Sequence, residues 1–380
     1  MGITLKQQSP AIQTQDPVEI ELKELFDKKL TIDELLVWTT EHNCSDLYIK
    51  ESEQPYISKF GKIYMVDCDP ITENIWQIFY DKYLTNEAQT KYVTDRLYDT
   101  SVAIRIPEKS PNFDKYKSHQ YRYRVSFGYS EDHSVATFRM IKPSTITFEN
   151  INYNPQCIQA LRAAYSQASG ICFFTGPTGS GKSTTMAACI NTFTRPGELL
   201  DNKVFITLED PIENLFENTR SVKIAQKELY RDFKSFALGI KAALREHPNQ
   251  IVVGEARDKE VICAAIEAAR TGHVTTTTFH ASDVAGTVNR IMYHLENDKN
   301  LCLDLILQTN IVLSQKMLKQ NGQYLVDTQY LLFNNEITKI LVDVLDTKDG
   351  NVSKAINALI ADPRIIQAGW AKDWDYKQLH

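Results

Sequence analysis

The chain has 380 residues, of which 43% are hydrophobic and 24% charged, with a formal net charge of -6. This composition excludes a disordered chain and is typical of a soluble globular protein with two or three domains. The mild acidity does not favour a nucleic-acid-binding protein, which usually carries a basic domain.

Cysteine usage and the start of the chain indicate the compartment. The seven cysteines are odd in number and never form a Cys-x-x-Cys pair, which argues against a zinc module or a disulfide framework. Residues 1–21 lack the order of a signal peptide, and no apolar run approaches the roughly 20 residues that span a bilayer. We therefore expect a cytoplasmic protein without a transmembrane segment, which reaches any membrane through partners.

The first third of the chain reads as a small α/β domain. Thr31 and Glu34 form a capping-box signature, which predicts a helix over residues 31–42. A second helix is predicted over residues 74–83. β-Branched and aromatic residues predict strands over residues 46–49, 97–106, 121–128 and 135–141.

The periodic pattern breaks after residue 142, in a stretch that contains Pro143 and several asparagines. We interpret this stretch as an interdomain linker. The predicted division is a flexible N-terminal segment (1–25), a first domain (26–142), a linker (143–154) and a second domain with a C-terminal helical tail (155–380).

The second domain opens with the strongest signal in the sequence, an apolar strand, a glycine-rich loop and a helix. The glycines let successive N–H groups face phosphate oxygens, and the helix N-terminus adds its dipole. Lys182 would neutralise the β and γ phosphates, and the Ser183 hydroxyl would bind Mg²⁺. The predicted nucleotide-binding residues are Gly176, Pro177, Thr178, Gly179, Ser180, Gly181, Lys182, Ser183 and Thr184.

Two acidic clusters follow predicted strands. Glu209 and Glu213 come after residues 204–208, and Glu255 follows residues 250–253 at a Walker B position. Ligands of open α/β sheets bind at the carboxyl ends of the strands. One carboxylate would hold Mg²⁺, for which Glu255 is the candidate, and another would orient and deprotonate the attacking water. Which of the three is the general base stays open.

A helix is predicted over residues 259–270 and a further strand over residues 274–279. His273 and His280 stand at opposite ends of that strand, so only His280 lies at the predicted catalytic edge. His280 is a candidate sensor of phosphate, and the alternative is a structural histidine.

Eight segments together carry a family resemblance. They are residues 44–47, 123–127, 137–140, 176–183, 207–213, 243–248, 253–258 and 271–281. Their order resembles the PilT-type secretion ATPases, which have a Walker A motif, an Asp box, a Walker B motif and a His box. The resemblance implies a PAS-like N-terminal domain, a RecA-like P-loop ATPase domain and a homohexameric ring that binds ATP and Mg²⁺.

The resemblance also implies roles for residues. Glu209, Glu213 and Glu255 would act in hydrolysis, and His280 would report the nucleotide state. Arg124 and Arg139 are the candidate arginine contacts, because a guanidinium clamps phosphate oxygens. The alternative is that both are solvated strand arginines. Arg122 has the same alternation phase as Arg124 along the strand and could take its place as the arginine contact.

Two departures from the family point to a subgroup. The chain lacks the four-cysteine module of assembly ATPases, and residues 335–341 differ from the corresponding segment of retraction ATPases. The chain resembles the subgroup that contains DotB and TraJ. This resemblance implies a motor that couples ATP hydrolysis to interdomain motion for type IVB secretion or conjugation. The implied partners are membrane-bound secretion components and another ATPase of the complex, at the inner face of the inner membrane.

Three other functions are weighed against this one. They are a pilus retraction ATPase, a RecA-like nucleic-acid motor with DNA-stimulated turnover, and a nucleotide-gated assembly subunit. Glu209 and Glu255 argue against the last, because a binding switch does not need hydrolytic carboxylates.

Overall fold

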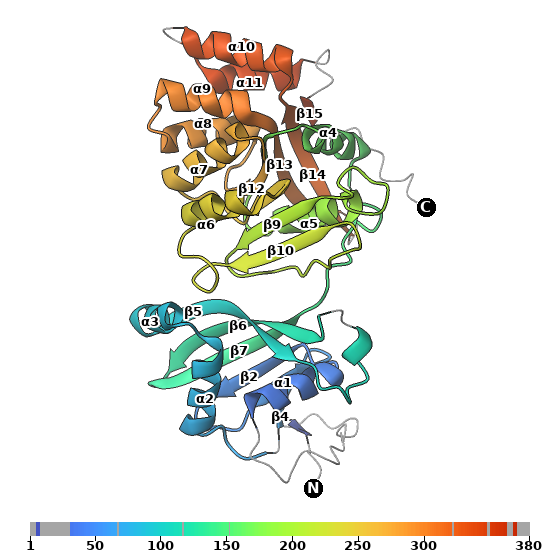
Figure 1. Cartoon of the computed structure of the whole chain (residues 1–380), viewed down its shortest axis with the longest axis vertical. Coiled ribbons are helices and arrows are strands. Elements are labelled where there is room, and N and C mark those ends of the chain that lie inside the picture. Colours follow the sequence, from blue (N-terminus) through green and yellow to red (C-terminus); the bar gives the residue numbers. More distant parts are fainter. Residues whose placement is uncertain are drawn as a thin grey trace. The chain divides into compact units, whose positions relative to one another are not determined.

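The computed structural model describes residues 5–7, 31–66, 68–115, 118–151, 153–320, 323–347, 350–362 and 368–370 (Figure 1). Contacts divide the chain into two units. The first contains residues 1–143 together with Asp210–Leu215 and Glu228–Asp232, and the second contains the remainder. The predicted domain boundaries stay a prediction, and apart from residues 5–7 the predicted flexible segment lies outside the described residues.

The first unit is built on a seven-stranded antiparallel sheet in the order β1-β4-β3-β2-β7-β6-β5. The four strands predicted from sequence correspond to β2, β5, β6 and β7, whereas the hairpin β3–β4 was not predicted. Strand β5 lies at the edge of this sheet. The strands are β1 (Leu5–Gln7), β2 (Asp46–Lys50), β3 (Tyr56–Lys59), β4 (Lys62–Val66), β5 (Leu97–Arg105), β6 (Gln120–Ser130) and β7 (His133–Ile141).

Helices α1 (Ile32–Glu41), α2 (Glu73–Tyr83) and α3 (Asn86–Asp95) pack on this sheet, and η1 (Phe113–Lys115) is a short 3₁₀ turn. The predicted capping box of α1 is confirmed, with both reciprocal hydrogen bonds formed. Helix α3 was not predicted, because its polar sequence has little apolar periodicity.

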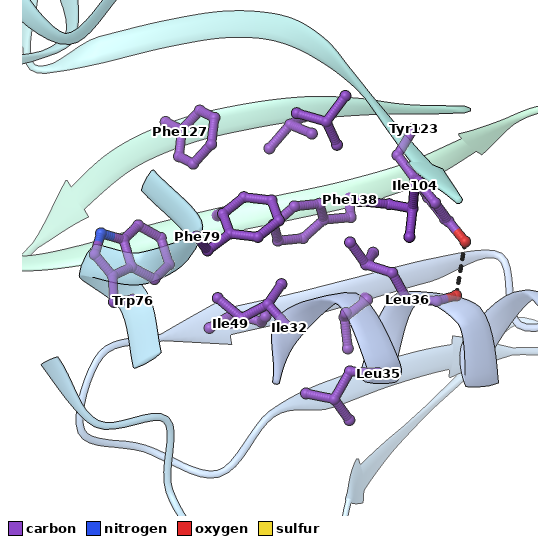
Figure 2. Close-up of a cluster of buried hydrophobic side chains, with 14 of the residues drawn as sticks. Ile32, Leu35, Leu36, Ile49, Trp76, Phe79, Ile104, Tyr123, Phe127 and Phe138 are labelled. Atoms are coloured by element: carbon purple, nitrogen blue, oxygen red, sulfur yellow. Dashed lines mark hydrogen bonds between the residues drawn. The ribbon is translucent and has the colours of Figure 1, made fainter. Parts of the chain in front are cut away.

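An aromatic core fills the space between the helices and strands of the first unit (Figure 2). Phe79 of α2 packs edge-on against Phe138, with ring centroids 5.4 Å apart. Trp76 packs in the same way against Phe127. The Tyr123 hydroxyl donates to the Leu36 carbonyl at 2.7 Å, so this buried phenol is satisfied.

The second unit contains an eight-stranded sheet in the order β10-β9-β11-β12-β8-β13-β14-β15. The five strands from β9 to β13 in this order are parallel, and β14 and β15 add antiparallel pairs. Its central strands are apolar or threonine-rich and buried, as parallel sheets covered on both faces require. The strands are β8 (Gly170–Thr175), β9 (Val204–Glu209), β10 (Lys223–Glu228), β11 (Gln250–Val253), β12 (Val274–Phe279), β13 (Thr309–Gln320), β14 (Gln323–Leu332) and β15 (Ala368–Trp370).

Helices cover both faces of this sheet (Figure 1). Cys172 and Phe174 of β8 belong to one core cluster with residues of α4 and α5, while α7 also packs on β8. Among the described residues, no helix combines the length and apolar content that crossing a membrane requires. The helices are α4 (Pro155–Tyr165), α5 (Lys182–Phe193), α6 (Phe236–Ala243), η2 (Leu244–Glu246), α7 (Lys259–Arg270), α8 (Val284–His294), α9 (Lys299–Gln308), α10 (Asn335–Asp346) and α11 (Val352–Ala361).

The aromatic core predicts a measurable loss of stability when it is truncated. Phe138 is 1% exposed, so Phe138→Ala leaves a cavity and should lower the free energy of unfolding by about 3–5 kcal/mol. Trp38 and Trp76 lie in the same core, so their fluorescence during urea titration reports this unit. Val93→Ala, at a position 63% exposed on α3, is the control and should unfold like wild type. Coincident midpoints for all three proteins would contradict the packing described.

Candidate functional site

Four segments that the sequence predicts to be functional follow four neighbouring parallel strands of the second unit. Strands β9, β11, β12 and β8 lie side by side in that order. Glu209 ends β9, and Glu255 is the second residue after β11, while His280 and the loop from Gly176 come directly after β12 and β8. Because the carboxyl ends of parallel strands meet at one edge, the sheet brings these segments to the same side.

The loop after β8 has the backbone of a phosphate cradle. Gly176, Gly179 and Gly181 have φ angles of 147°, 77° and 85°, which side-chain-bearing residues rarely adopt. A Cβ on Gly176 would stand 2.3 Å from the Gln315 carbonyl oxygen, so the close approach of β13 also requires glycine there. Helix α5 begins at Lys182, and no side chain caps its first turn. Its N-terminal amides therefore face the loop as donors for an anion.

Side chains of the loop are arranged around the same cradle. Lys182 Nζ donates to the carbonyls of Gly176 and Pro177 at 2.9 and 3.0 Å. Gln315 Nε2 donates to the Ser180 carbonyl at 2.7 Å, and the Ser180 hydroxyl is buried without a hydrogen-bond partner among the described residues. The donors, the cation and the positive φ angles fit a polyphosphate. The hydroxyl of Ser183 and the carboxylate of Glu255 are the oxygen ligands that Mg²⁺ prefers.

Glu255 lies between two cationic or protonatable side chains. Arg257 Nε donates to Oε2 of Glu255 at 2.6 Å, and His280 Nε2 lies 3.3 Å from Oε1. Arg290 donates to the His280 carbonyl at 2.7 Å and so fixes the segment after β12. His280 thus contacts a predicted hydrolytic carboxylate, whereas the His273 ring at the other end of β12 faces the Ala268 carbonyl.

The predicted acidic segment 209–213 is divided between the two units. Glu209 belongs to the second unit, where Oε1 accepts from Thr207 Oγ1 at 2.6 Å and Gln226 Nε2 at 3.0 Å. Glu213 belongs to the first unit, where Arg124 donates to its carboxylate at 3.4 Å. Two acids only four positions apart therefore lie in different structural environments.

The candidate arginines lie together on the sheet of the first unit. Arg124 of β6 and Arg139 of β7 are cross-strand partners. Arg124 contacts Glu213 and lies 3.9 Å from the Asp99 carboxylate, while Arg139 donates to buried Asp46 at 2.7 Å. The alternative candidate, Arg122, instead donates to the Ser101 hydroxyl at 3.1 Å.

Sequence reasoning missed the glutamines of this site. Gln226 supports Glu209, and Gln315 supports the phosphate loop from 135 positions away along the chain. Neither stands in a motif, and only the strand order shows that β13 lies next to β8. An amide in a strand carries no sequence signal for such a contact.

Comparisons with known proteins agree with this architecture. Residues 28–339 match the family described as "Type II/IV secretion system protein". The type IV pilus retraction ATPase PilT of Pseudomonas aeruginosa is 29% identical over 299 residues, which cover 77% of this chain and 79% of that protein.

Two solved structures are similar over most of the chain. The Legionella pneumophila ATPase DotB has a TM-score of 0.74 and 28% identity, covering 87% of this chain and 88% of that one. The pilus retraction motor PilT with bound ADP has a TM-score of 0.67 and 25% identity, covering 87% and 89%. The predicted resemblance to PilT-type secretion ATPases is confirmed by the family match and by these structures. The similarity to the DotB and PilT structures also supports the mixed α/β fold.

The loop geometry predicts that Gly176→Ala impairs nucleotide binding. The added Cβ would meet backbone of β13, so the loop must shift, and we expect at least about a tenfold loss of affinity for a fluorescent ATP analogue. Gly197→Ala is the matched control, since its φ of 80° is equally left-handed but its Cβ would meet nothing within 4 Å. Equal affinity in the two variants would show that close packing on β13 does not shape the loop.

Proposed function

We propose that this chain, which belongs to the family of type II/IV secretion system proteins, is an ATP hydrolase that drives a secretion or transfer machine. One observation carries the proposal: the loop from Gly176 to Ser183, Glu255 and His280 follow neighbouring parallel strands at one sheet edge. A phosphate cradle beside an ionisable pair is what nucleotide hydrolysis needs.

The proposed chemistry uses residues of this chain in defined roles. Lys182 leaves the loop carbonyls and neutralises the β and γ phosphates, while the amides of the loop hold their oxygens. Ser183 and Glu255 would hold Mg²⁺, which supplies charge neutralisation when bound. Glu209 or Glu255 orients the attacking water and accepts its proton, with Glu213 as the third candidate. His280, in contact with Glu255, links that carboxylate to the nucleotide state.

Arg124 and Arg139 are proposed to contact the γ phosphate, because a guanidinium stabilises the charge that develops in phosphoryl transfer. Both now bind carboxylates, and Arg124 is paired with an acid that is itself a candidate hydrolytic residue. We propose that nucleotide exchange alters these pairs and that the resulting motion of the two units is the mechanical output.

We propose further that six copies form a ring that serves a type IVB secretion or conjugation system. The similarity to DotB, over 87% of this chain, supports this role. The expected partners are membrane-bound secretion components and a second ATPase, at the inner face of the inner membrane. Pilus retraction is the second candidate, supported by the similarity to PilT over 77% of the chain. Deleting the gene in its own host separates them: loss of transfer supports the first, and extended pili that do not retract support the second.

Two substitutions should separate nucleotide binding from hydrolysis. Lys182→Ala removes the cation of the cradle and should weaken binding of the ATP analogue, whereas Glu255→Gln keeps the cradle and should bind nucleotide normally. Both should lower steady-state Mg²⁺-dependent turnover by at least about 100-fold. Glu267→Gln, at an exposed position of α7, is the charge-matched control and should turn over like wild type.

The same assay should be run on protein separated by size, with and without DNA. Turnover confined to a hexamer-sized peak and indifferent to DNA supports the secretion motor. Binding without turnover would show a nucleotide-gated subunit instead, and strong stimulation by DNA would favour a nucleic-acid motor.

A further inference from the structure

Glu228 is a buried carboxylate that belongs to none of the predicted site motifs. It is 1% exposed, and both of its oxygens accept hydrogen bonds. Oε1 accepts from the Thr100 hydroxyl and from the Ser101 amide at 2.7 Å, and Oε2 accepts from the Ile212 amide at 3.3 Å. The Arg231 guanidinium lies 3.8 Å away. Burying a carboxylate is costly unless it is hydrogen-bonded or paired with a positive charge. The hydrogen bonds to both oxygens and the nearby guanidinium offset that cost for Glu228.

These contacts join three segments of the first unit. Thr100 and Ser101 belong to edge strand β5, Ile212 to segment 210–215, and Glu228 and Arg231 to segment 228–232. Arg231 also donates to the carbonyl and hydroxyl of Ser101 at 3.1 and 3.0 Å. At Ser101, where edge strand β5 has no further strand to pair with among the described residues, the side chains of Glu228 and Arg231 bind the backbone amide and carbonyl instead.

Both residues that Glu228 holds through their amides stand next to a predicted site residue. Ser101 is the cross-strand partner of Arg124, and Ile212 directly precedes Glu213. Arg124 and Glu213 form an ion pair at 3.4 Å, and their side chains are 43% and 48% exposed. An exposed pair of this kind does little to fix its own geometry. The backbone on either side of it is fixed instead by the Glu228 carboxylate.

We propose that Glu228 is a positioning residue for ATP hydrolysis, which holds Arg124, through its ion pair with Glu213, where it acts during phosphoryl transfer. The inference rests on the proposed function. Loss of the Glu228 carboxylate would let segment 210–215 move away from β5, so Arg124 would reach the transferring phosphate less often. Such a change lowers kcat and leaves nucleotide affinity nearly unchanged, because the cradle around Lys182 belongs to the other unit.

Glu228→Gln is the first test. The amide cannot accept hydrogen bonds at both ends, so at least one of the three hydrogen bonds is lost while side-chain volume is kept. We expect kcat to fall about tenfold, with affinity for the ATP analogue unchanged within about twofold. Tyr92→Phe is the matched control, since it removes a part-buried hydrogen bond to the Gly128 carbonyl in the same unit. It should keep wild-type kcat even if it lowers stability.

A double-mutant cycle separates positioning from general stability. If Glu228 acts through Arg124, then Glu228→Gln should lower kcat in the wild-type background and add little in an Arg124→Gln background. Effects that multiply, or an unchanged kcat in Glu228→Gln, would overturn the inference while leaving the proposed function intact. Where Glu228→Gln does not fold, Thr100→Val takes its place, because it removes one hydrogen-bond donor to Glu228 and keeps the side-chain shape. Its effect on kcat is then compared in the wild-type and Arg124→Gln backgrounds. A wild-type protein without turnover refutes the proposed function, and the inference with it, before any variant is compared.

Discussion

The parallel order of four strands is the constraint on which this protein's candidate site depends. Strands β9, β11, β12 and β8 each end at the same edge, and each delivers a different chemical group there. Because parallel strands need crossover connections, these groups are far apart in sequence yet adjacent in the sheet. Buried apolar and threonine side chains hold these strands in register. The same buried side chains therefore form the core of the second unit and fix the strand ends that carry the candidate site residues.

The glycine-rich loop after β8 shows that a local motif still needs tertiary support. Its glycines permit the backbone, but the conformation is bounded by β13, whose Gln315 contributes a carbonyl next to Gly176 and an amide to Ser180. Such support orders the backbone donors of the loop without a ligand, and electrostatic stabilisation of an anion requires preorganised donors. The conformation of the loop therefore depends on β13 as well as on β8 and α5, which it connects.

The acidic segment after β9 is shared between the two units. Glu209 stays with the sheet of the second unit, while Glu213 pairs with Arg124 in the first. A change in the relative position of the two units would thus change the separation of two candidate hydrolytic acids within a few residues of chain. The proposed coupling of nucleotide state to unit movement rests on this division.

The sequence by itself determined what depends on neighbours along the chain: the capping box of α1, the glycine-rich loop between β8 and α5, the strands that precede Glu209 and Glu255, and the placement of His280 at the edge opposite His273. It did not reveal the β3–β4 hairpin, the contacts of Gln315, Arg124 and Glu228, or several other elements, which are helices α3, α4, α6, α8 and α9 and strands β10, β13 and β14. Those contacts join positions 135, 89 and 127 residues apart. Only the tertiary structure decides them, because partner choice over such distances depends on which strands become neighbours, and local periodicity carries no information about that.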